Sequence, residues 1–133
     1  MAIDLNQVQS FLALRQARRQ QAHNQRFIEA WRDFRAIVEM LISKYQPQRI
    51  YQWGSLLNPR TFSERSDIDI AIEGITEAAR FFALYGEADQ LARFPLDLVA
   101  LEKIEPEFAE IIRLKAIVVY DRDQPNPGPH FRN

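Results

Sequence analysis

The sequence predicts an α+β fold, an α/β two-layer domain in which helices cover a small β-sheet. Three observations support this prediction. The first 46 residues contain no proline or glycine and carry an apolar stripe at helical spacing. Four short runs of strand-forming residues follow, and helical segments separate the last three runs. A sheet with one apolar face needs helices to cover that face.

The first predicted helix spans residues 24–45. Its apolar residues recur every three or four positions in one stripe: Phe27, Trp31, Phe34, Val38, Leu41 and Tyr45. Such a stripe is typical of a helix that packs on a core. Upstream, residues 15–26 are polar apart from two alanines, and a shorter apolar group precedes them. Either one long helix projects into solvent, or a kink near residue 23 folds a separate helix back.

The remaining elements follow in the order β, β, α, β, α, β. We expect the strands at residues 49–53, 67–73, 96–101 and 117–120. One helix is expected from Thr76, as its N-cap, to about residue 94, and another over 106–116 with Pro106 in its first turn. The chain therefore divides into an N-terminal helical extension (1–23), a folded domain (24–120) and a proline-rich tail (121–133) that we expect to be disordered.

Composition excludes several classes of function. The chain has no cysteine, which excludes disulfides, zinc–thiolate sites and a cysteine nucleophile. It has two histidines, far apart in sequence, which disfavours a His-rich metal site. No apolar run reaches the ~20 residues of a membrane span, and no secretory signal is visible. We therefore expect a cytoplasmic protein that does not interact with membranes.

Charge is distributed unevenly along the chain. Residues 1–35 carry six arginines and three acidic residues, whereas the whole chain has a net charge of -1. This basic segment can contact an acidic partner, although runs of this kind are more often a solvated helix face.

Three aspartates mark the predicted site. Asp67 and Asp69 lie two positions apart in DIDIAIE, so a strand directs both carboxylates to one face, about 7 Å apart along the backbone. Like charges so placed repel unless a cation lies between them, and Mg²⁺ prefers oxygen ligands. Asp97 lies in the apolar run LDLVAL and can join them if the two strands are neighbours. Glu73 shares the face of Asp69 further along, and we expect it to be solvated.

Gly54 and Ser55 directly follow the first predicted strand. Glycine there lets the backbone turn sharply and approach a ligand closely. Backbone N–H groups and the Ser55 hydroxyl can then hold phosphate oxygens. The complete pattern is a strand, Gly-Ser, eleven residues, Asp67-Ile-Asp69, a helix and the strand that carries Asp97. This pattern indicates a nucleotide–metal site.

This pattern resembles the minimal nucleotidyltransferase (MNT) group of the DNA polymerase β-type nucleotidyltransferase superfamily. The resemblance covers roughly residues 25–120, which would make 24–120 the nucleotidyltransferase domain. It implies a mixed sheet with flanking helices, Mg²⁺, and transfer of a nucleoside monophosphate from a nucleoside triphosphate such as ATP. It also implies that Asp67, Asp69 and Asp97 bind metal and catalyse, and that Gly54 and Ser55 bind the nucleotide. Many MNT proteins are antitoxins of HEPN-type ribonuclease toxins, and some modify the toxin with AMP.

Three functional hypotheses remain open at this point. The first is an Mg²⁺-dependent enzyme that transfers AMP to a hydroxyl of a partner protein, as an MNT-type antitoxin would. The second is a binding module that neutralises a partner through its N-terminal helices, without catalysis. The third is modification of a small molecule such as an aminoglycoside, which an acidic cleft would attract. A homo-oligomer through the N-terminal helices is compatible with each of them.

Overall fold

The computed structural model describes residues 2–131 and has the predicted element order. The long first helix is followed by four strands and two further α-helices. In chain order, the elements are α1 (Leu5–Met40), β1 (Arg49–Trp53), β2 (Ile68–Glu73), α2 (Ala78–Leu91), β3 (Leu96–Ala100), α3 (Pro106–Lys115) and β4 (Ile117–Asp121). Within these residues, no helix has the length and apolar character needed to cross a membrane.

The sheet is mixed, as the resemblance implied. Its strand order is β3-β2-β1-β4, with β2 and β3 parallel and the other two pairs antiparallel. The parallel pair is joined by the right length of chain for a helical crossover, which α2 supplies. Strand β2 therefore lies between β1, which leads into Gly54, and β3, which carries Asp97.

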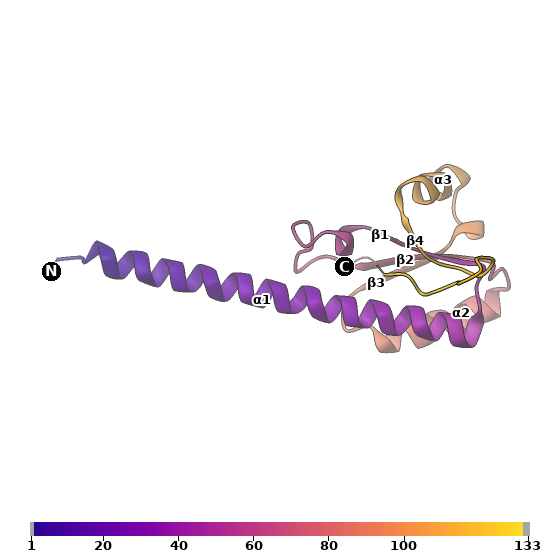
Figure 1. Ribbon diagram of the computed structural model, residues 1–133, viewed down its shortest axis with the longest axis horizontal. Helices are drawn as coiled ribbons and strands as arrows, with labels where there is room; N and C mark the ends of the chain where they lie inside the picture. The colour runs from indigo at the N-terminus through magenta and orange to yellow at the C-terminus, as the bar shows by residue number, and fades with distance from the viewer. Residues whose placement is uncertain (1, 132–133) are drawn as a thin grey trace.

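Helices α1 and α2 cover one face of the sheet, and α3 covers the other (Figure 1). The alternation in β2 decides which residues meet which helices. Ile68, Ile70 and Ile72 are fully buried in the core beneath α1 and α2. The residues between them face α3, where Ala71 packs with Tyr51 and Ile112. The main core thus lies on the α1/α2 side of the sheet.

Helix α1 is one continuous helix, so of the two arrangements left open, the structure has the projecting one (Figure 1). Asp4 caps its N-terminus by accepting hydrogen bonds from the backbone N–H groups of Asn6 and Gln7. Residues 2–22 are exposed throughout, whereas the stripe from Phe27 onward packs on the domain. The division between residues 23 and 24 falls inside this helix, and residue 1 lies outside the described residues.

Helix α2 starts later than the sequence predicted. Thr76 is not its N-cap: the helix begins at Ala78, after Glu77, and no side chain caps it. It continues through Gly86 without a break and ends at Leu91. The predicted cap was wrong because Thr76 lies in the turn between β2 and the helix and so precedes the first helical residue by two positions.

The tail differs from the disordered segment that its composition favoured. Residues 122–131 return along β4, where the His130 backbone N–H donates to the carbonyl oxygen of Val119 at 2.7 Å. The ring of Phe131 packs edge-on against Phe34 of α1 at 5.8 Å, and the Arg35 guanidinium lies over the Phe131 ring. One aromatic side chain therefore anchors a proline-rich segment. Residues 132–133 lie outside the described residues.

Candidate active site

The three aspartates predicted from the sequence converge on the α3 face of the sheet. Asp69 of β2 and Asp97 of β3 are direct partners in the parallel register. Paired residues on neighbouring strands point to the same face and lie about 4.8 Å apart. Asp67 immediately precedes β2 and is two positions from Asp69. The strands therefore bring together side chains that the sequence could relate only in pairs.

Burial and mutual repulsion act on these carboxyls. Burial, with added repulsion from Asp97 and then Asp67, raises the pKa of Asp69 to about 7. Burial and the charge of Asp67 also raise the pKa of Asp97. Both shifts disfavour the charged form. Neither has a nearby cationic side chain among its causes, so the negative charge of these carboxylates is not offset by neighbouring side chains.

Several acidic side chains elsewhere in the domain have basic partners. Asp33, which is buried, accepts hydrogen bonds from the backbone and guanidinium of Arg93, with a closest ion-pair distance of 3.0 Å. Among the described residues, none of the ion pairs involves Asp67, Asp69 or Asp97. The cluster is therefore the part of the sheet where a bound cation would neutralise the most uncompensated negative charge.

The donor set fits a divalent cation of the Mg²⁺ type. It consists of carboxylate oxygens, the hard ligands that such ions prefer, and it is partly desolvated. The chemistry of these residues therefore suits the ion. Within residues 2–131, the side chains do not form a group of three His, Cys, Asp or Glu residues arranged to hold a metal ion.

Gly54 lies directly beside this cluster. Its φ of +84° is in the region that favours glycine. A Cβ at this position would overlap the carboxylate of Asp69, whose Cγ would be 2.8 Å away. Trp53 and Asp69 are register partners, so the end of β1 delivers Gly54 to the acidic cluster. Only a residue without a side chain allows this close approach.

Ser55 opens a short turn whose position is fixed by the core. The turn spans Ser55–Leu57, and Leu56 is fully buried. The indole N–H of Trp31 in α1 donates to the carbonyl oxygen of Leu56 at 3.1 Å. The hydroxyl of Thr61 donates to the carbonyl oxygen of Ser55 at 3.1 Å. Helix α1 therefore helps to position the turn that the sequence assigns to phosphate binding.

A protein-family comparison decides the classification. Residues 35–125 match the family described as Polymerase beta, Nucleotidyltransferase. The chain belongs to this family. The matched segment contains the whole sheet, Gly54, Ser55 and the three aspartates. The expected superfamily is thereby confirmed, and residues 35–125 form a polymerase β-type nucleotidyltransferase domain.

Two solved structures are similar to this nucleotidyltransferase domain, and the one with the higher TM-score shares its fold. A crystal structure of a mutant toxin–antitoxin MntA-HpeT matches with a TM-score of 0.55 and 18% identity, over 68% of this chain and 75% of that chain. A candidate nucleotidyltransferase from Sulfolobus solfataricus matches with a TM-score of 0.49 and 21% identity, over 77% and 89% of the two chains. No curated protein matched the chain. At these identities, the MntA likeness confirms an MNT-like fold.

The sequence did not reveal an aromatic pair beside the site of this nucleotidyltransferase. Trp53 of β1 meets Phe108 of α3 edge-to-face at 6.1 Å. The indole nitrogen of Trp53 is buried without a hydrogen-bond partner. Alternation in RIYQW does put Trp53 on the face opposite Gln52, but the contact depends on where α3 lies. This pair provides an apolar wall at the end of the sheet where the aspartates lie.

Glu73 has a different role from the solvated one expected. It accepts a hydrogen bond from the Tyr51 hydroxyl and pairs with Arg113 at 3.4 Å and Arg49 at 3.9 Å. Arg49 also pairs with Asp121 at 3.0 Å. These contacts neutralise the far end of the α3 face. The uncompensated charge of the sheet is therefore confined to the end that carries Asp67, Asp69 and Asp97.

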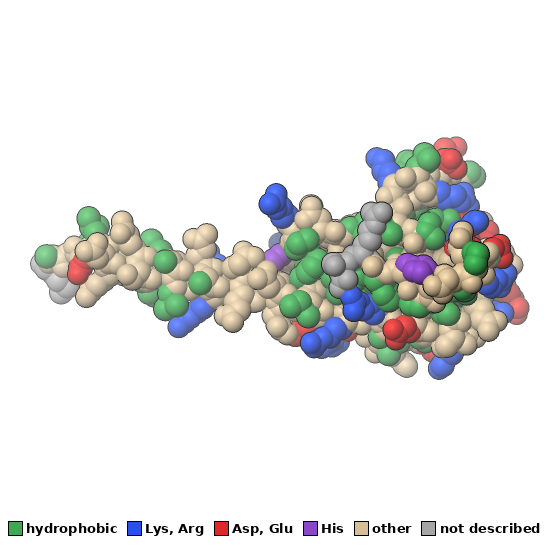
Figure 2. Space-filling model, in the orientation of Figure 1, with side chains coloured by type: hydrophobic (Ala, Val, Ile, Leu, Met, Phe, Trp, Pro, Cys, Tyr) green, Lys and Arg blue, Asp and Glu red, His purple; other side chains and the backbone are tan. Residues whose placement is uncertain are grey.

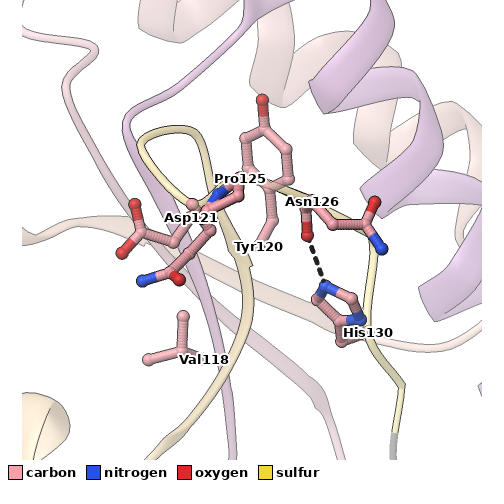
Figure 3. Close-up of a pocket in the computed structure, with 7 residues that line it drawn as sticks. Val118, Tyr120, Asp121, Pro125, Asn126 and His130 are labelled. Atoms are coloured by element: carbon pink, nitrogen blue, oxygen red, sulfur yellow. Dashed lines mark hydrogen bonds between the residues drawn. The ribbon is translucent and has the colours of Figure 1, made fainter.

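A separate hollow of about 530 Å³ lies at the opposite edge of the sheet, between β4 and the tail (Figure 3). Val118, Tyr120 and Asp121 line one side, and a ring nitrogen of His130 is 2.9 Å from the carbonyl oxygen of Asn126. None of the three aspartates lines it. Its residues offer neither a carboxylate cluster nor a glycine turn, so we do not assign nucleotidyl transfer to this hollow.

Proposed function

We propose that this domain is an Mg²⁺-dependent enzyme that transfers a nucleoside monophosphate, AMP from ATP, to a hydroxyl group of a partner protein. The observation that carries the proposal is the register of Asp69 with Asp97, with Gly54 against the same Asp69 carboxylate. These contacts support the proposal because they bring Gly54, Asp69 and Asp97 together at one end of the sheet. Their arrangement suits phosphoryl-type chemistry, which depends mainly on positioning and charge neutralisation.

In this proposal, each group has a separate role. The turn at Gly54 and Ser55 holds the triphosphate through backbone N–H groups and the Ser55 hydroxyl. Asp67, Asp69 and Asp97 would hold the cation, which when bound neutralises phosphate charge and polarises the reacting phosphoryl group. Asp97 orients the acceptor hydroxyl and takes its proton. The acceptor oxygen forms a bond to the α-phosphorus, the bond to the β-phosphate oxygen breaks, and pyrophosphate leaves.

The proposed acceptor is a toxin of the HEPN type, which makes the protein an MNT-type antitoxin. Two observations support this part of the proposal. The MntA structure that shares this fold is that of a toxin–antitoxin. In addition, the site opens beside an exposed aromatic, Phe108, and has no second lobe within residues 2–131 to enclose a small acceptor. A protein can bring its own surface to complete such a site.

The decisive experiment incubates the protein with α-³²P-ATP and Mg²⁺, first alone and then with host-cell lysate. We expect a labelled protein that is absent with Asp67→Ala and Asp69→Ala. Glu64→Ala is the matched control, because Glu64 is an exposed acid of the neighbouring loop. Circular dichroism would verify that each variant is folded. Equal labelling by the wild type and both aspartate variants would refute the proposed enzyme.

A non-catalytic binding module is the second candidate, and the projecting part of α1 favours it. Residues 2–22 are all exposed and carry several exposed apolar side chains. If this candidate is right, removal of residues 2–22 should abolish capture of the partner protein. Capture that persists after the removal would count against the binding module.

A further inference from the structure

The projecting N-terminal part of α1 carries apolar side chains that the rest of the chain leaves uncovered (Figure 2). The exposed side chains on it, with their exposed fractions, are Leu5 (71%), Val8 (40%), Phe11 (63%), Leu12 (53%) and Leu14 (53%). A cluster of this kind on a single helix usually indicates association, because exposed apolar area is unfavourable in water. The side of the helix that carries Val8 and Phe11 is therefore expected to have a partner.

Residue spacing defines a line along the helix. Positions that alternate by four and three residues stay on one side of an α-helix and form the contact line between paired helices. One such line contains the N-cap residue and five helical ones: Asp4, Val8, Phe11, Arg15, Arg18 and Ala22. Leu5 and Leu12 lie beside this line. The apolar residues are flanked by an acid at one end and by bases at the other.

We propose that this line pairs with the same line of a second copy of the chain, antiparallel and tip to tip. When residue numbers in facing positions add up to 19, Val8 faces the other copy's Phe11, and Asp4 faces its Arg15. Leu5 of one copy then lies beside Leu12 of the other. Each apolar side chain of the line meets another, and each end of the contact has opposite charges.

Charge selects this arrangement over the parallel one. In a parallel pair, Asp4 would face Asp4, Arg15 would face Arg15, and Arg18 would face Arg18, so every charged layer would be repulsive. A longer antiparallel overlap would place the apolar residues against the arginines of the polar segment. The tip-to-tip overlap avoids both and leaves Arg18 and Arg19 beyond the end of the other helix.

The proposed contact is short, so the dimer should be weak. The overlap from Asp4 to Arg15 spans about 16 Å at ~1.5 Å per residue. We expect a monomer–dimer equilibrium in the micromolar range, visible by sedimentation velocity over a series of concentrations. Phe11→Gln with Val8→Gln should give a monomer. Asn6→Ala with Ser10→Ala, on the other side of the helix, is the matched control and should leave the dimer unchanged.

Charge variants test the orientation. Asp4→Asn keeps the capping acceptor and removes the charge, and Arg15→Gln removes its partner. Each substitution removes the ion pair at both ends of the contact and should weaken the dimer by about two- to thirtyfold. The loss of dimer affinity in the double variant should not exceed the sum of the two single losses, because both substitutions remove the same ion pair. Arg19→Gln, an equal loss of positive charge outside the overlap, should have little effect.

Cross-linking decides between antiparallel and parallel pairing, since the chain has no cysteine of its own. A mixture of full chains carrying Asp4→Cys and Arg15→Cys should form a disulfide-linked heterodimer under mild oxidation. Arg15→Cys alone should not, because the two copies of position 15 would be about 16 Å apart, beyond the reach of a disulfide. Cross-linking of Arg15→Cys alone, or a monomer at every concentration, would overturn the proposal. Nucleotidyl transfer is scored separately and does not enter this test.

Discussion

The two faces of the sheet differ sharply although the same strands build both. Toward α1 and α2, β2 presents Ile68, Ile70 and Ile72, all fully buried. Toward α3, the same strand presents Asp69, Ala71 and Glu73, of which Glu73 is neutralised by arginines and Asp69 is not. One face therefore contributes folding free energy, and one end of the other face carries charge that costs free energy.

This difference separates stability from chemistry at the level of single residues. Neighbouring positions of β2 alternate between the two faces, so a substitution at one position should affect stability and a substitution at the next should affect activity. The following predictions test that separation, from the largest expected effect to the smallest.

Asp97→Asn should have the largest effect, on catalysis alone. The amide keeps the shape of the side chain but cannot accept the acceptor proton and binds a divalent cation poorly. We expect transfer to fall by about a thousandfold, within the range of lost acid–base catalysis. Label transfer in single-turnover assays measures the rate. An unchanged rate in Asp97→Asn would contradict the role given to Asp97.

Ile70→Ala should affect stability rather than chemistry. Removing a fully buried side chain beneath α1 leaves a cavity and should lower the free energy of unfolding by about 2–5 kcal/mol. Urea unfolding followed by tryptophan fluorescence measures it. Val118→Ala, at a half-exposed position of β4, is the control and should change stability by less than about 0.5 kcal/mol. Equal effects would show that the two positions do not differ in packing as described.

Gly54→Ala should affect both properties, because Gly54 touches the site through its backbone. The added Cβ would overlap Asp69, and φ is +84°, so we expect a loss of at least about 1 kcal/mol in stability and reduced transfer. Gly86→Ala is the matched control: nothing lies within 4 Å of its Cβ position in α2, so it should stabilise by about 0.5–1 kcal/mol. Similar outcomes for the two glycines would contradict the close approach.

Asp69→Asn should produce the smallest of these effects, a modest stabilisation of the metal-free protein. Because the folded state raises the pKa of Asp69 from 3.8 to about 7, the carboxyl favours folding most at low pH, and this contribution declines as the pH rises toward 7. In EDTA, the melting temperature of Asp69→Asn should exceed that of the wild type by about a few degrees near pH 8, and less at pH 4. Asp33→Asn should do the opposite and destabilise, since Asp33 is paired with Arg93.

Much of the site could be predicted because it is encoded in local patterns. The alternation in DIDIAIE fixes the facing of Asp67 and Asp69, and Gly-Ser after a strand indicates a turn. The position of Asp97 required one further fact, that β3 lies parallel beside β2, which no local pattern contains. The pairing of Trp53 with Phe108 was not predicted for the same reason.

The points that sequence interpretation left open or got wrong have specific physical causes. Residues 15–26 favour a helix but contain no stop signal, so the sequence could not choose between a straight and a folded-back helix. The proline-rich composition of the tail hid the effect of Phe131, one side chain that finds the core. Thr76 is a good capping residue, but the turn after β2 sets the start of α2 two residues later.

The contact of the tail with α1 has a consequence for synthesis of the protein on the ribosome. Strand β4 and residues 122–131 are made after the rest of the sheet, yet β4 pairs with β1 and Phe131 packs on Phe34. The sheet and its core therefore cannot be completed until residue 131 has left the exit tunnel. The projecting half of α1, made before the sheet, is outside the ribosome throughout this time. Two neighbouring nascent chains on one messenger RNA could thus meet through α1 before either domain has folded.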